Sequence, residues 1–401
     1  MKKIGQFCTC DVENYGDILY PICLNKILLA NNSTVEPKAF SFIEGAALGD
    51  AGYNVSQIQK VLNNQEAISS LIIGGGDIIR SDKFMLASHY VSLYRHIRHE
   101  TILQKIMEKI FGIPDLVLEF IEKYMNYEAS GPFIIDKNHF NHLNEVIYCS
   151  CGVPFEFPDQ VKSLVTNAFN NASFIYLRDE QSKQKLINVG VTNKIHVAPD
   201  LICTISDFFD FNTHKKNGLE ILYAHGLQDG KDFLCFQANP TCRSSIDEII
   251  TQLTKIKAER NLEIVLLPIG YCHDDDVILK EINDRSNNQF IYANVHSIYD
   301  MLSIITASSV FIGTSMHGNI TAFSYGIPHL VAPINVDKMR GFLDVCNLSN
   351  NLLLDSWKEM AEKLDFLDTL ERDYFSSRAI IAKDKIYKVT DNIFKLISDE
   401  N

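Results

Sequence analysis

The sequence predicts an α/β protein with two Rossmann-like, doubly wound domains that face each other across a cleft. Three observations support this fold class. The chain has 401 residues, more than a single hydrophobic core usually organises. Short apolar runs of strand length alternate with longer stretches of helical period, as in βα units built on parallel sheets. A polar stretch over residues 209–218 separates an earlier series of these units from a later one.

The expected strands are continuously apolar because the strands of a parallel sheet are covered by helices on both faces. In the first series the strands cover residues 3–9, 70–73, 145–151, 173–177 and 195–197. In the second series they cover residues 233–237, 263–268, 290–293, 310–313 and 329–332. Between these strands, residues 244–257 and 298–307 have the apolar spacing of helices.

The polar stretch divides the chain into an N-terminal domain over residues 1–215 and a C-terminal domain over residues 216–373. Residues 374–401 carry apolar side chains at helical spacing, and we expect a closing helix there. Residues 85–127 interrupt the first series with a long helical pattern. That insertion either packs on its own domain or forms an interfacial surface that meets a membrane or a lipid-linked substrate.

The charge balance restricts the kind of partner. Lys and Arg number 37 against 50 Asp and Glu, so the formal net charge is −13 with His neutral. This acidic balance argues against nucleic acid, because a nucleic-acid binder needs a basic field to meet phosphate. The acidic net charge is still compatible with a local basic pocket that binds one small anion.

The composition also predicts a compartment. Several of the ten cysteines (Cys149, Cys151, Cys203 and Cys235) lie in apolar runs, where reduced thiols pack as small hydrophobic side chains. The chain reaches Asp11 too early for the apolar core of a signal peptide, and it has no run of 18 apolar residues that would span a membrane. We therefore expect a cytoplasmic protein, with membrane association through residues 85–127 as an option.

A first candidate for chemistry is the polar turn of Asn14, Gly16 and Asp17, directly after the first predicted strand. Ligands of open α/β sheets bind at the carboxyl ends of strands, so this turn is well placed to bind one. Gly16 lets the backbone approach a ligand in this turn. The alternative is that Asp17 only caps a helix that begins at Ile18.

A second candidate is the run of Gly74, Gly75 and Gly76 that leads to Asp77. The N–H groups of such a loop can surround an anion or let a substrate lie close to the backbone. The run lacks the Lys-Ser/Thr of a P-loop and the Gly-x-Gly-x-x-Gly spacing of a dinucleotide site. The alternative is a tight strand-to-helix turn without a ligand.

Arg178 stands at the end of the predicted strand over residues 173–177. An arginine at a strand end can hold an anion with two parallel hydrogen bonds. An ion pair with Asp179 or Asp200 is the equally open alternative.

The most unusual stretch is the turn after residues 310–313, which carries Ser315, His317, Gly318 and Asn319. Backbone N–H groups at the start of the following helix form a ready anion site. A histidine at the same point can donate to the anion and exchange protons near neutral pH. A histidine with a purely structural role is the alternative.

Other patterns are weaker. Lys338 and Arg340 offer two cations after another predicted strand end, or simply lie in a solvated loop. The cysteines have Cys-x-Cys rather than paired Cys-x-x-Cys spacing, and the acidic residues after His273 are explained by a helix N-terminus, so we expect no metal site. No Gly-x-Ser-x-Gly elbow supplies a hydrolase nucleophile.

The motifs occur in a fixed order: Asn14-Tyr15-Gly16-Asp17, Gly74-Gly75-Gly76-Asp77, Arg178-Asp179-Glu180-Gln181-Ser182 with Pro199-Asp200, and Ser315-Met316-His317-Gly318. Together they resemble the polysaccharide pyruvyltransferase family, over residues 4–350. The resemblance implies a glycosyltransferase-B-like pair of domains. It also implies transfer of pyruvate from phosphoenolpyruvate, as co-substrate and without a cofactor, onto sugar hydroxyls as a ketal during surface polysaccharide assembly.

On this hypothesis the site residues fall into three groups. The catalytic residues are His317, Asp17 and Asp77. The donor-binding or anion-binding residues are Ser315, Gly318, Asn319, Lys338, Arg340 and Arg178. The acceptor-binding residues are Asn14, Gly16, Gly74, Gly75 and Gly76. Many members of the family carry Arg-Leu-His-Gly where this chain has Ser315-Met316-His317-Gly318, so Arg178, Lys338 or Arg340 would supply the missing cation.

The sequence thus predicts a ketal-forming pyruvyltransferase whose partners are phosphoenolpyruvate and a sugar acceptor, either free or lipid-linked. One alternative is a glycosyltransferase-B-type glycosyltransferase that uses a nucleotide-sugar donor. Another is a non-catalytic, glycan-binding member of the family, which the missing arginine favours.

Overall fold

The computed structural model describes residues 2–31, 34–44, 53–79 and 131–398, so the insertion predicted at 85–127 lies outside the described residues. Its contacts group the chain into two compact units. The N-terminal unit comprises Met1–Glu13, Asp17–Ala198 and Tyr387–Asn401, and the C-terminal unit comprises Asn14–Gly16 and Pro199–Ile386.

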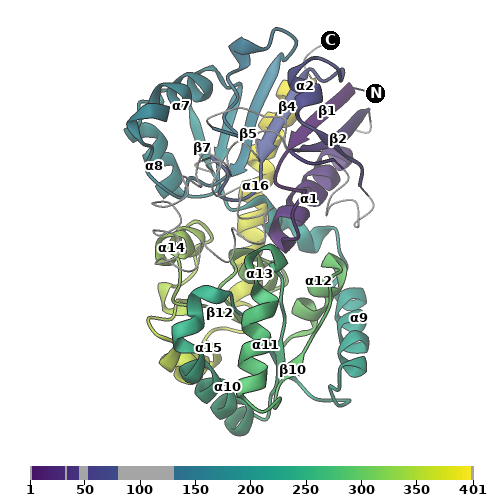
Figure 1. The fold of residues 1–401 in the computed structure, drawn as a ribbon, viewed down its shortest axis with the longest axis vertical. Helices are drawn as coiled ribbons and strands as arrows, with labels where there is room; N and C mark the ends of the chain where they lie inside the picture. The colour runs from purple at the N-terminus through teal and green to yellow at the C-terminus, as the bar shows by residue number, and fades with distance from the viewer. Residues whose placement is uncertain (1, 32–33, 45–52, 80–130, 399–401) are drawn as a thin grey trace, which may run out of the picture. The chain divides into compact units, whose positions relative to one another are not determined.

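The N-terminal unit is built on a parallel sheet of strand order β3-β2-β1-β4-β5-β6-β7 (Figure 1). Its strands are β1 (Lys2–Phe7), β2 (Val35–Ser41), β3 (Val55–Gln57), β4 (Ser70–Gly74), β5 (Glu145–Cys151), β6 (Phe174–Leu177) and β7 (Ile195–Val197). Strands β2 and β3 are added on one side of β1, and strands β5, β6 and β7 are added on the opposite side, beyond β4. The topological switch point, where ligands of such sheets bind, therefore lies between β1 and β4.

The helical segments of this unit are α1 (Tyr15–Asn31), α2 (Gln59–Leu62), η2 (Lys137–His139), α7 (Asp159–Asn171) and α8 (Glu180–Asn188). Crossovers between parallel strands are right-handed, so the two directions of travel put α1 on one face of the sheet and α7 and α8 on the other. This is the doubly wound arrangement that the sequence predicts.

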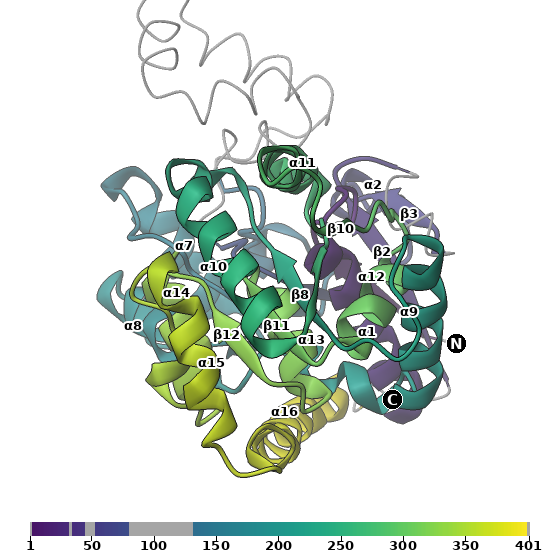
Figure 2. The ribbon, with the colours of Figure 1, turned by 90° about the horizontal axis from the view of Figure 1, so that it is seen from below.

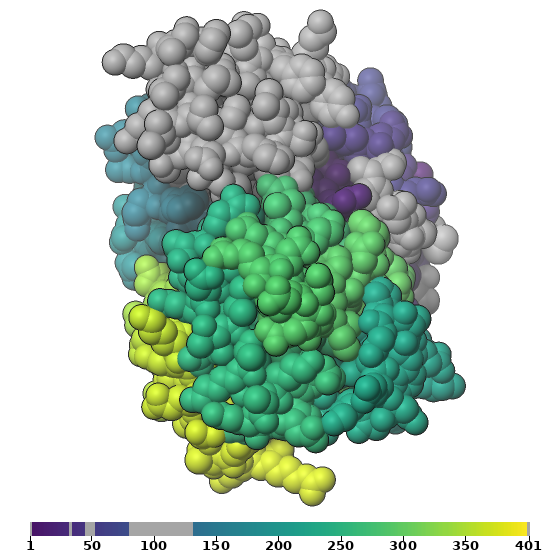
Figure 3. Space-filling view, turned by 60° about the horizontal axis from the view of Figure 1, so that its bottom comes forward, coloured from purple at the N-terminus to yellow at the C-terminus, as the bar shows by residue number. Residues whose placement is uncertain are grey.

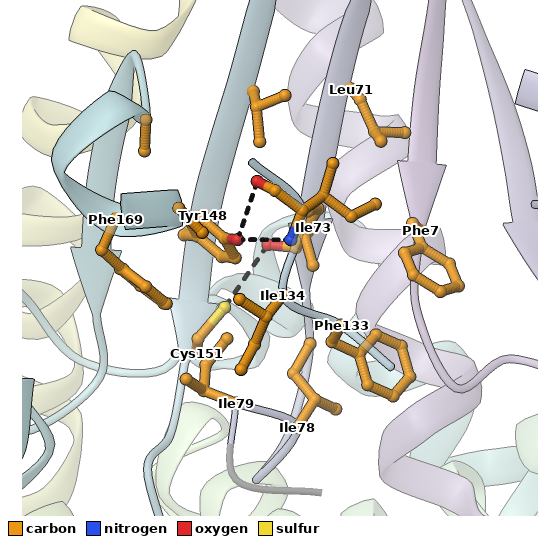
Figure 4. Packing of buried hydrophobic residues seen from close by; sticks show 14 of the residues in the cluster. Phe7, Leu71, Ile73, Ile78, Ile79, Phe133, Ile134, Tyr148, Cys151 and Phe169 are labelled. Atoms are coloured by element: carbon orange, nitrogen blue, oxygen red, sulfur yellow. Dashed lines mark hydrogen bonds between the residues drawn. The ribbon is translucent and has the colours of Figure 1, made fainter. Parts of the chain in front are cut away.

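The core of the N-terminal unit joins the sheet to the segment around Phe133 (Figure 4). The ring of Phe133 lies 4.7 Å from the ring of Phe7, measured between centroids. The buried hydroxyl of Tyr148 accepts a hydrogen bond from Ile135 N at 3.0 Å and donates one to Ile135 O at 3.3 Å. These contacts anchor the segment around Phe133 onto β1 and β5, the neighbours of β4 in the sheet.

The C-terminal unit contains a second parallel sheet, of order β10-β9-β8-β11-β12. Its strands are β8 (Phe233–Gln237), β9 (Glu263–Leu266), β10 (Ile291–Tyr292), β11 (Val310–Gly313) and β12 (His329–Val331). The same reasoning places the switch point of this sheet between β8 and β11.

The α-helices of this unit are α9 (Phe211–Ala224), α10 (Ile246–Arg260), α11 (Asp275–Arg285), α12 (Ile298–Ala307), α13 (Met316–Ser324), α14 (Val336–Val345) and α15 (Met360–Asp368). Its 3-10 helices are η3 (Leu201–Asp207), η4 (Pro240–Ser245), η5 (Tyr271–His273), η6 (Asn350–Leu352) and η7 (Trp357–Glu359). The last helix, α16 (Tyr374–Ser398), contributes to both units. Teal-to-green residues of this unit form a continuous surface in Figure 3.

All ten predicted strands are present, four with the predicted ends and six with ends shifted by one or two residues. The strands β2 and β3 were not predicted from the sequence. β2 carries Glu36, Pro37 and Lys38, which do not fit the apolar pattern of a covered parallel strand. Among the described residues β2 pairs with β3 only over residues 39–41, so Pro37 faces none of the described strands on that side and is tolerated there.

The predicted linker over residues 209–218 is wrong, because most of it belongs to α9. In both ribbon views α9 lies beside α12 (Figures 1 and 2). Gly218 permits this contact, since a Cβ there would overlap the Ser303 carbonyl of α12. His214 Nδ1 also lies within hydrogen-bond distance, 2.8 Å, of Ser303 Oγ.

The contacts divide the chain after Ala198 rather than after residue 215. The reason is that η3 is bonded to α13: Ser206 Oγ donates to Ser324 O, and Ser324 Oγ donates to Cys203 O, each at 2.8 Å. None of the described helices has the length and hydropathy of a membrane-spanning helix. All ten cysteines lie in described segments, where they are buried thiols outside any disulfide.

Candidate functional site

Two groups of polar residues lie at the carboxyl ends of the parallel strands, one in each unit. The N-terminal group consists of Asp17, Gly74, Gly75, Gly76, Asp77 and Arg178. The C-terminal group consists of Asn14, Gly16, Asp200, Gln237, Asp275, Ser315 and His317. Each group includes residues that follow the two strands flanking the switch point of its sheet.

The glycine turn after β4 requires glycine at every position. Gly75 and Gly76 have φ angles of +87° and +77°, in the left-handed region that L side chains rarely adopt. At Gly74 a Cβ would overlap the hydroxyl of Tyr20, which donates to the Cys149 carbonyl at 2.9 Å. Packing and backbone geometry therefore explain these glycines, and their acceptor-binding role stays a prediction.

Arg178 follows β6 and is 3% exposed. Its guanidinium is paired with Asp77, and its Nε lies 4.0 Å from Asp179 Oδ2. The side chains of the Asp77–Arg178 pair both lie so close to Gly152 that a Cβ there would clash with each of them. Asp179 is thus a partner, as the sequence suggests, and Asp77 is a further partner that was not predicted.

Asp17 lies in the first turn of α1, because this helix begins at Tyr15. The prediction that Asp17 caps a helix starting at Ile18 is therefore wrong. A carboxylate in the first turn interacts favourably with the helix dipole. Asp17 Oδ1 lies 3.2 Å from the position that a Cβ on Gly76 would take, so the structure brings Asp17 to the glycine turn.

The turn between β11 and α13 is built by the residues that the sequence assigned to donor binding. Ser315 is the N-cap of α13, and its Oγ accepts from Gly318 N at 3.3 Å. Asn319 is fully buried, and its Nδ2 donates to Ser315 O at 2.8 Å. At Gly318 a Cβ would clash with the ring of Phe311. These three residues hold the turn in shape.

His317 sits in the first turn of α13 and is 9% exposed. Its Nε2 is buried and has no hydrogen-bond partner among the described residues. The Oδ2 of Asp200, a residue 3% exposed, lies 3.8 Å from this nitrogen. Because that separation is longer than a hydrogen bond, Nε2 can still bind a ligand atom or transfer a proton.

The segment Asn14–Gly16 packs against the same turn. The hydroxyl of Tyr15 lies 3.0 Å from Thr321 Oγ1 in α13. Gly16 lies so close to the imidazole of His317 that a Cβ would overlap the ring. The structure thus unites Gly16 with His317, two residues that the sequence assigned to different substrates.

Gln237 and Asp275 form a buried network beside the turn. Gln237 Nε2 donates to Asp275 Oδ2 at 2.8 Å, and Gln237 Oε1 accepts from Ser315 N at 2.7 Å. Asp275 Oδ2 also accepts from Gly270 N at 2.8 Å. Burial raises the pKa of the Asp275 carboxyl to about 7, although the hydrogen bonds from Gln237 and the backbone act in the opposite direction.

Lys338 and Arg340 lie in α14, where Lys338 is half-buried and Arg340 is exposed. Gln237 and Asp200 make polar contacts with the His317 turn. The acidic run after His273 opens α11, as predicted. Across the described segments, no group of three or more His, Cys, Asp or Glu side chains is placed to hold a metal ion.

Gln237, Asp275 and Asp200 were not assigned to the site from the sequence. Gln237 ends the apolar strand β8, and a single polar residue at the carboxyl end of a strand is a usable signal. Asp275 was interpreted only as part of a helix N-terminus. Asp200 was considered only as a partner of Arg178, whereas the structure places it beside His317.

A model of the polysaccharide pyruvyl transferase family matches residues 14–334. The matched segment is more than half of the chain and contains both polar groups. The chain belongs to this family. As a polysaccharide pyruvyl transferase family member it is a transferase of the polysaccharide-modifying kind, and the resemblance seen in its motifs is confirmed.

Solved structures show which fold this family member shares. HepE of Anabaena, in complex with UDP, matches with a TM-score of 0.54 at 12% identity, over 99% of this chain and 100% of that chain. A glycosyltransferase from Rickettsia africae matches with a TM-score of 0.57 at 11% identity, over 100% and 99%. MnaA of S. aureus, in a co-structure with UDP, matches with a TM-score of 0.53 at 12% identity, over 94% and 91%. No curated protein was found to match. The glycosyltransferase-B-like fold class is confirmed.

Proposed function

We propose that this protein transfers pyruvate from phosphoenolpyruvate to two hydroxyls of a sugar, as a ketal, during assembly of a surface polysaccharide. The observation that carries the proposal is the state of His317. Its buried Nε2 has no hydrogen-bond partner among the described residues, lies 3.8 Å from Asp200 Oδ2, and falls within the segment that the family model matches. A histidine held in this way can exchange a proton with a substrate atom.

The reaction delivers one proton and removes two. A proton adds to the methylene carbon of phosphoenolpyruvate, and the electron pair of the double bond forms the new C–H bond. The first sugar hydroxyl adds to the resulting cationic carbon and loses its proton. The second hydroxyl then displaces inorganic phosphate, which leaves with the electrons of its C–O bond and takes up the second proton. One acid–base group serves the first two steps, because it gives up a proton and then regains it.

We assign this proton exchange to His317. The capped first turn of α13 holds its backbone, and Asp200 Oδ2 lies 3.8 Å from its Nε2. Acid–base assistance by a positioned side chain typically contributes about 10²–10⁴-fold to a rate. That is the loss expected when the imidazole is removed.

Donor binding requires cations and N–H groups, because phosphoenolpyruvate carries a phosphate and a carboxylate. Ser315 cannot supply a cation, and its side chain caps α13. We assign the donor to the N–H groups at the start of α13 together with Lys338 and Arg340 of the same unit. Arg178 belongs to the N-terminal unit, where its guanidinium is paired with Asp77. Single replacement of Lys338 or Arg340 by Gln is expected to raise KM for phosphoenolpyruvate more than it lowers kcat.

Acceptor binding is assigned to the N-terminal group, where Asp17 and Asp77 would orient sugar hydroxyls beside the glycine turn. A lipid-linked acceptor, with peripheral membrane contact through residues 85–127 of a cytoplasmic protein, extends the same proposal. Pelleting with vesicles that contain anionic lipid tests that extension, and a variant lacking 85–127 is its control.

The experiment that tests the function incubates the purified protein with phosphoenolpyruvate and a panel of sugar acceptors. Release of inorganic phosphate is followed together with the ketal product by mass spectrometry. His317→Asn is expected to lower the rate by about 10²-fold or more. His225→Asn, at an exposed histidine, is the control and keeps the rate. Full activity of His317→Asn would refute the assignment.

A second candidate is a glycosyltransferase that uses a nucleotide-sugar donor. The observation in its favour is that HepE and MnaA, which share the fold, are solved in complex with UDP. This candidate predicts that UDP or UDP-glucose raises the melting temperature of the protein while phosphoenolpyruvate does not. The opposite result supports pyruvyl transfer, and stabilisation by glycans alone would favour a non-catalytic binder.

A further inference from the structure

We propose that Gln237 and Asp275 are positioning residues that hold the β11–α13 turn, and with it the imidazole of His317, in the orientation needed for proton transfer. The inference rests on the proposed function in one respect only, which is the catalytic role of His317. The network itself is a feature of the C-terminal unit alone, since all three residues belong to it.

The first step of the argument is that the carboxamide of Gln237 has one satisfactory orientation. Its Nε2 faces Asp275 Oδ2 at 2.8 Å, and its Oε1 accepts from Ser315 N at 2.7 Å and from Thr314 Oγ1 at 3.1 Å. An N–H can only donate and a carboxylate oxygen can only accept, so a flipped amide would lose these bonds. The side chain therefore links the start of the His317 turn to Asp275 with defined geometry.

The second step is that Asp275 fixes a second segment at the same time. Its Oδ2 also accepts from Gly270 N at 2.8 Å and from Ile269 N at 3.3 Å. These residues follow β9, while Gln237 ends β8, and β9, β8 and β11 are neighbours in the sheet. One buried carboxylate, 2% exposed, thus ties together the ends of three adjacent strands.

The third step concerns the ring of His317 rather than its backbone. Ile269 O accepts from Tyr15 N at 2.9 Å, and Gly270 forms an isolated antiparallel bridge with Asn14. Gly16, which follows Tyr15, is the residue that lies against the imidazole of His317. The loop of Ile269 and Gly270, which is hydrogen-bonded to Asp275, therefore also positions Gly16, and Gly16 restricts the position of the His317 ring.

The fourth step is an energetic comparison. A buried carboxylate carries a desolvation penalty, and replacing a whole buried charged network by apolar side chains of similar volume is often neutral or stabilising. What a fully bonded polar network supplies is a unique arrangement of the groups it joins. Two segments constrain His317: its own turn and the segment that contains Gly16. Both are linked to Asp275 by hydrogen bonds, as expected if Asp275 positions the histidine.

The test compares variants at both residues. Gln237→Met keeps the length of the side chain but removes its donor and acceptor. Gln237→Glu keeps the shape but puts an oxygen of a second carboxyl where Nε2 donated to Asp275, so it serves if Gln237→Met fails to fold. Asp275→Leu removes the shared acceptor, whereas Asp275→Asn retains one oxygen acceptor. Asp136→Asn is the matched control, because Asp136 is 6% exposed and accepts from Asn171 Nδ2 at 3.0 Å in the N-terminal unit.

Two readouts are measured. The first is kcat and KM for phosphoenolpyruvate. The second is the imidazole nitrogen signals of His317 in protein labelled with ¹⁵N-histidine, assigned by their loss in His317→Asn. The second readout requires no turnover, so it tests positioning even if pyruvyl transfer is not the activity.

Gln237→Met and Gln237→Glu are expected to lower kcat by about 10- to 100-fold with KM changed by no more than about two-fold, because misplacing a catalytic group costs this much. The His317 signals shift in both variants. Asp275→Asn recovers at least about ten-fold of the kcat that Asp275→Leu loses, since the acceptor is restored. Asp136→Asn leaves kcat and the His317 signals unchanged. Unchanged His317 signals in both Gln237 variants, or a rise in KM at constant kcat, would overturn the proposal.

Discussion

The contact between Gly16 and His317 is the closest constraint on the candidate catalytic residue. The backbone of Gly16 lies where any Cβ would overlap the imidazole, so glycine is needed there for close approach rather than for a special backbone angle. The hydroxyl of Tyr15, one residue earlier, lies within hydrogen-bond distance of Thr321 in α13 and keeps this segment in place.

Gly16→Ala is therefore expected to displace the imidazole of His317. A misplaced catalytic group predicts a loss of about 10- to 100-fold in kcat, measured by ketal formation. The melting temperature should fall much less, because the rest of the core is unchanged. Lys216→Ala, at an exposed position in α9, is the control. Equal kcat values for Gly16→Ala and the wild type would show that the ring does not depend on this contact.

The sequence singled out Gly16 and His317 separately but not as a pair. Both stand out locally, one as a glycine in a polar turn and the other as a histidine in a strand-to-helix turn. Their contact could not be predicted, because 300 residues of intervening chain fold before the two meet. Asp200 shows the same limit, since it was considered only as a partner of Arg178.

At the scale of elements, β12 and three helices enclose a second buried histidine. His329 Nδ1 lies 3.0 Å from Ile327 O, and its ring lies 4.7 Å from that of Phe375 in α16, between centroids. Phe323 of α13 and Phe342 of α14 complete the aromatic surroundings. Burial lowers the pKa of His329 from 6.5 to about 4.

This depressed pKa predicts a loss of stability in acid. The unfolded chain takes up a proton at His329 below about pH 6.5 and the folded chain only below about pH 4, so stability is lost as the pH falls through this window. The expected loss in the free energy of unfolding is at most about 3 kcal/mol, because each pKa unit corresponds to about 1.36 kcal/mol. His329→Phe, which suits the aromatic surroundings, should flatten the dependence of the unfolding free energy on pH between 6.5 and 4.

Denaturant unfolding at several pH values measures this effect. His225→Phe, at an exposed histidine, is the control and should keep the slope of the wild type. A slope for His329→Phe equal to that of the wild type would contradict the prediction.

Elements were predicted well where one local pattern decided them. The continuous apolar runs identified the covered strands, because a parallel strand is buried on both faces. The same rule missed β2, whose Glu36, Pro37 and Lys38 lie where the strand has no partner on one side. The helix α9 was predicted as a linker, because its stability comes from packing on α12 rather than from its own apolar content.

At the scale of the whole molecule, the net charge of −13 opposes the approach of an anionic donor. Local cations can hold phosphoenolpyruvate once it has arrived, but the long-range field acts before those contacts form. Salt screens this field over about 10 Å at 0.1 M.

We therefore expect KM for phosphoenolpyruvate to fall as salt rises from about 0.01 M to about 0.15 M, because screening weakens the repulsion. Steady-state kinetics at matched pH measures the effect, and an uncharged acceptor sugar provides the control, since its KM should not change. A KM for phosphoenolpyruvate that rises with salt would show that the cations at the site outweigh the overall charge.

The sequence by itself determined the fold class, the strands of both sheets apart from β2 and β3, and the turn that carries His317, because apolar runs and polar strand ends are local patterns. Tertiary structure alone decided what surrounds that histidine. Gly16, Asp200, Gln237 and Asp275 come from distant parts of the chain and meet there. Gln237 and Asp275 reach the turn because strands β9, β8 and β11 are neighbours. Strand order depends on how whole βα units pack, so no local pattern encodes it.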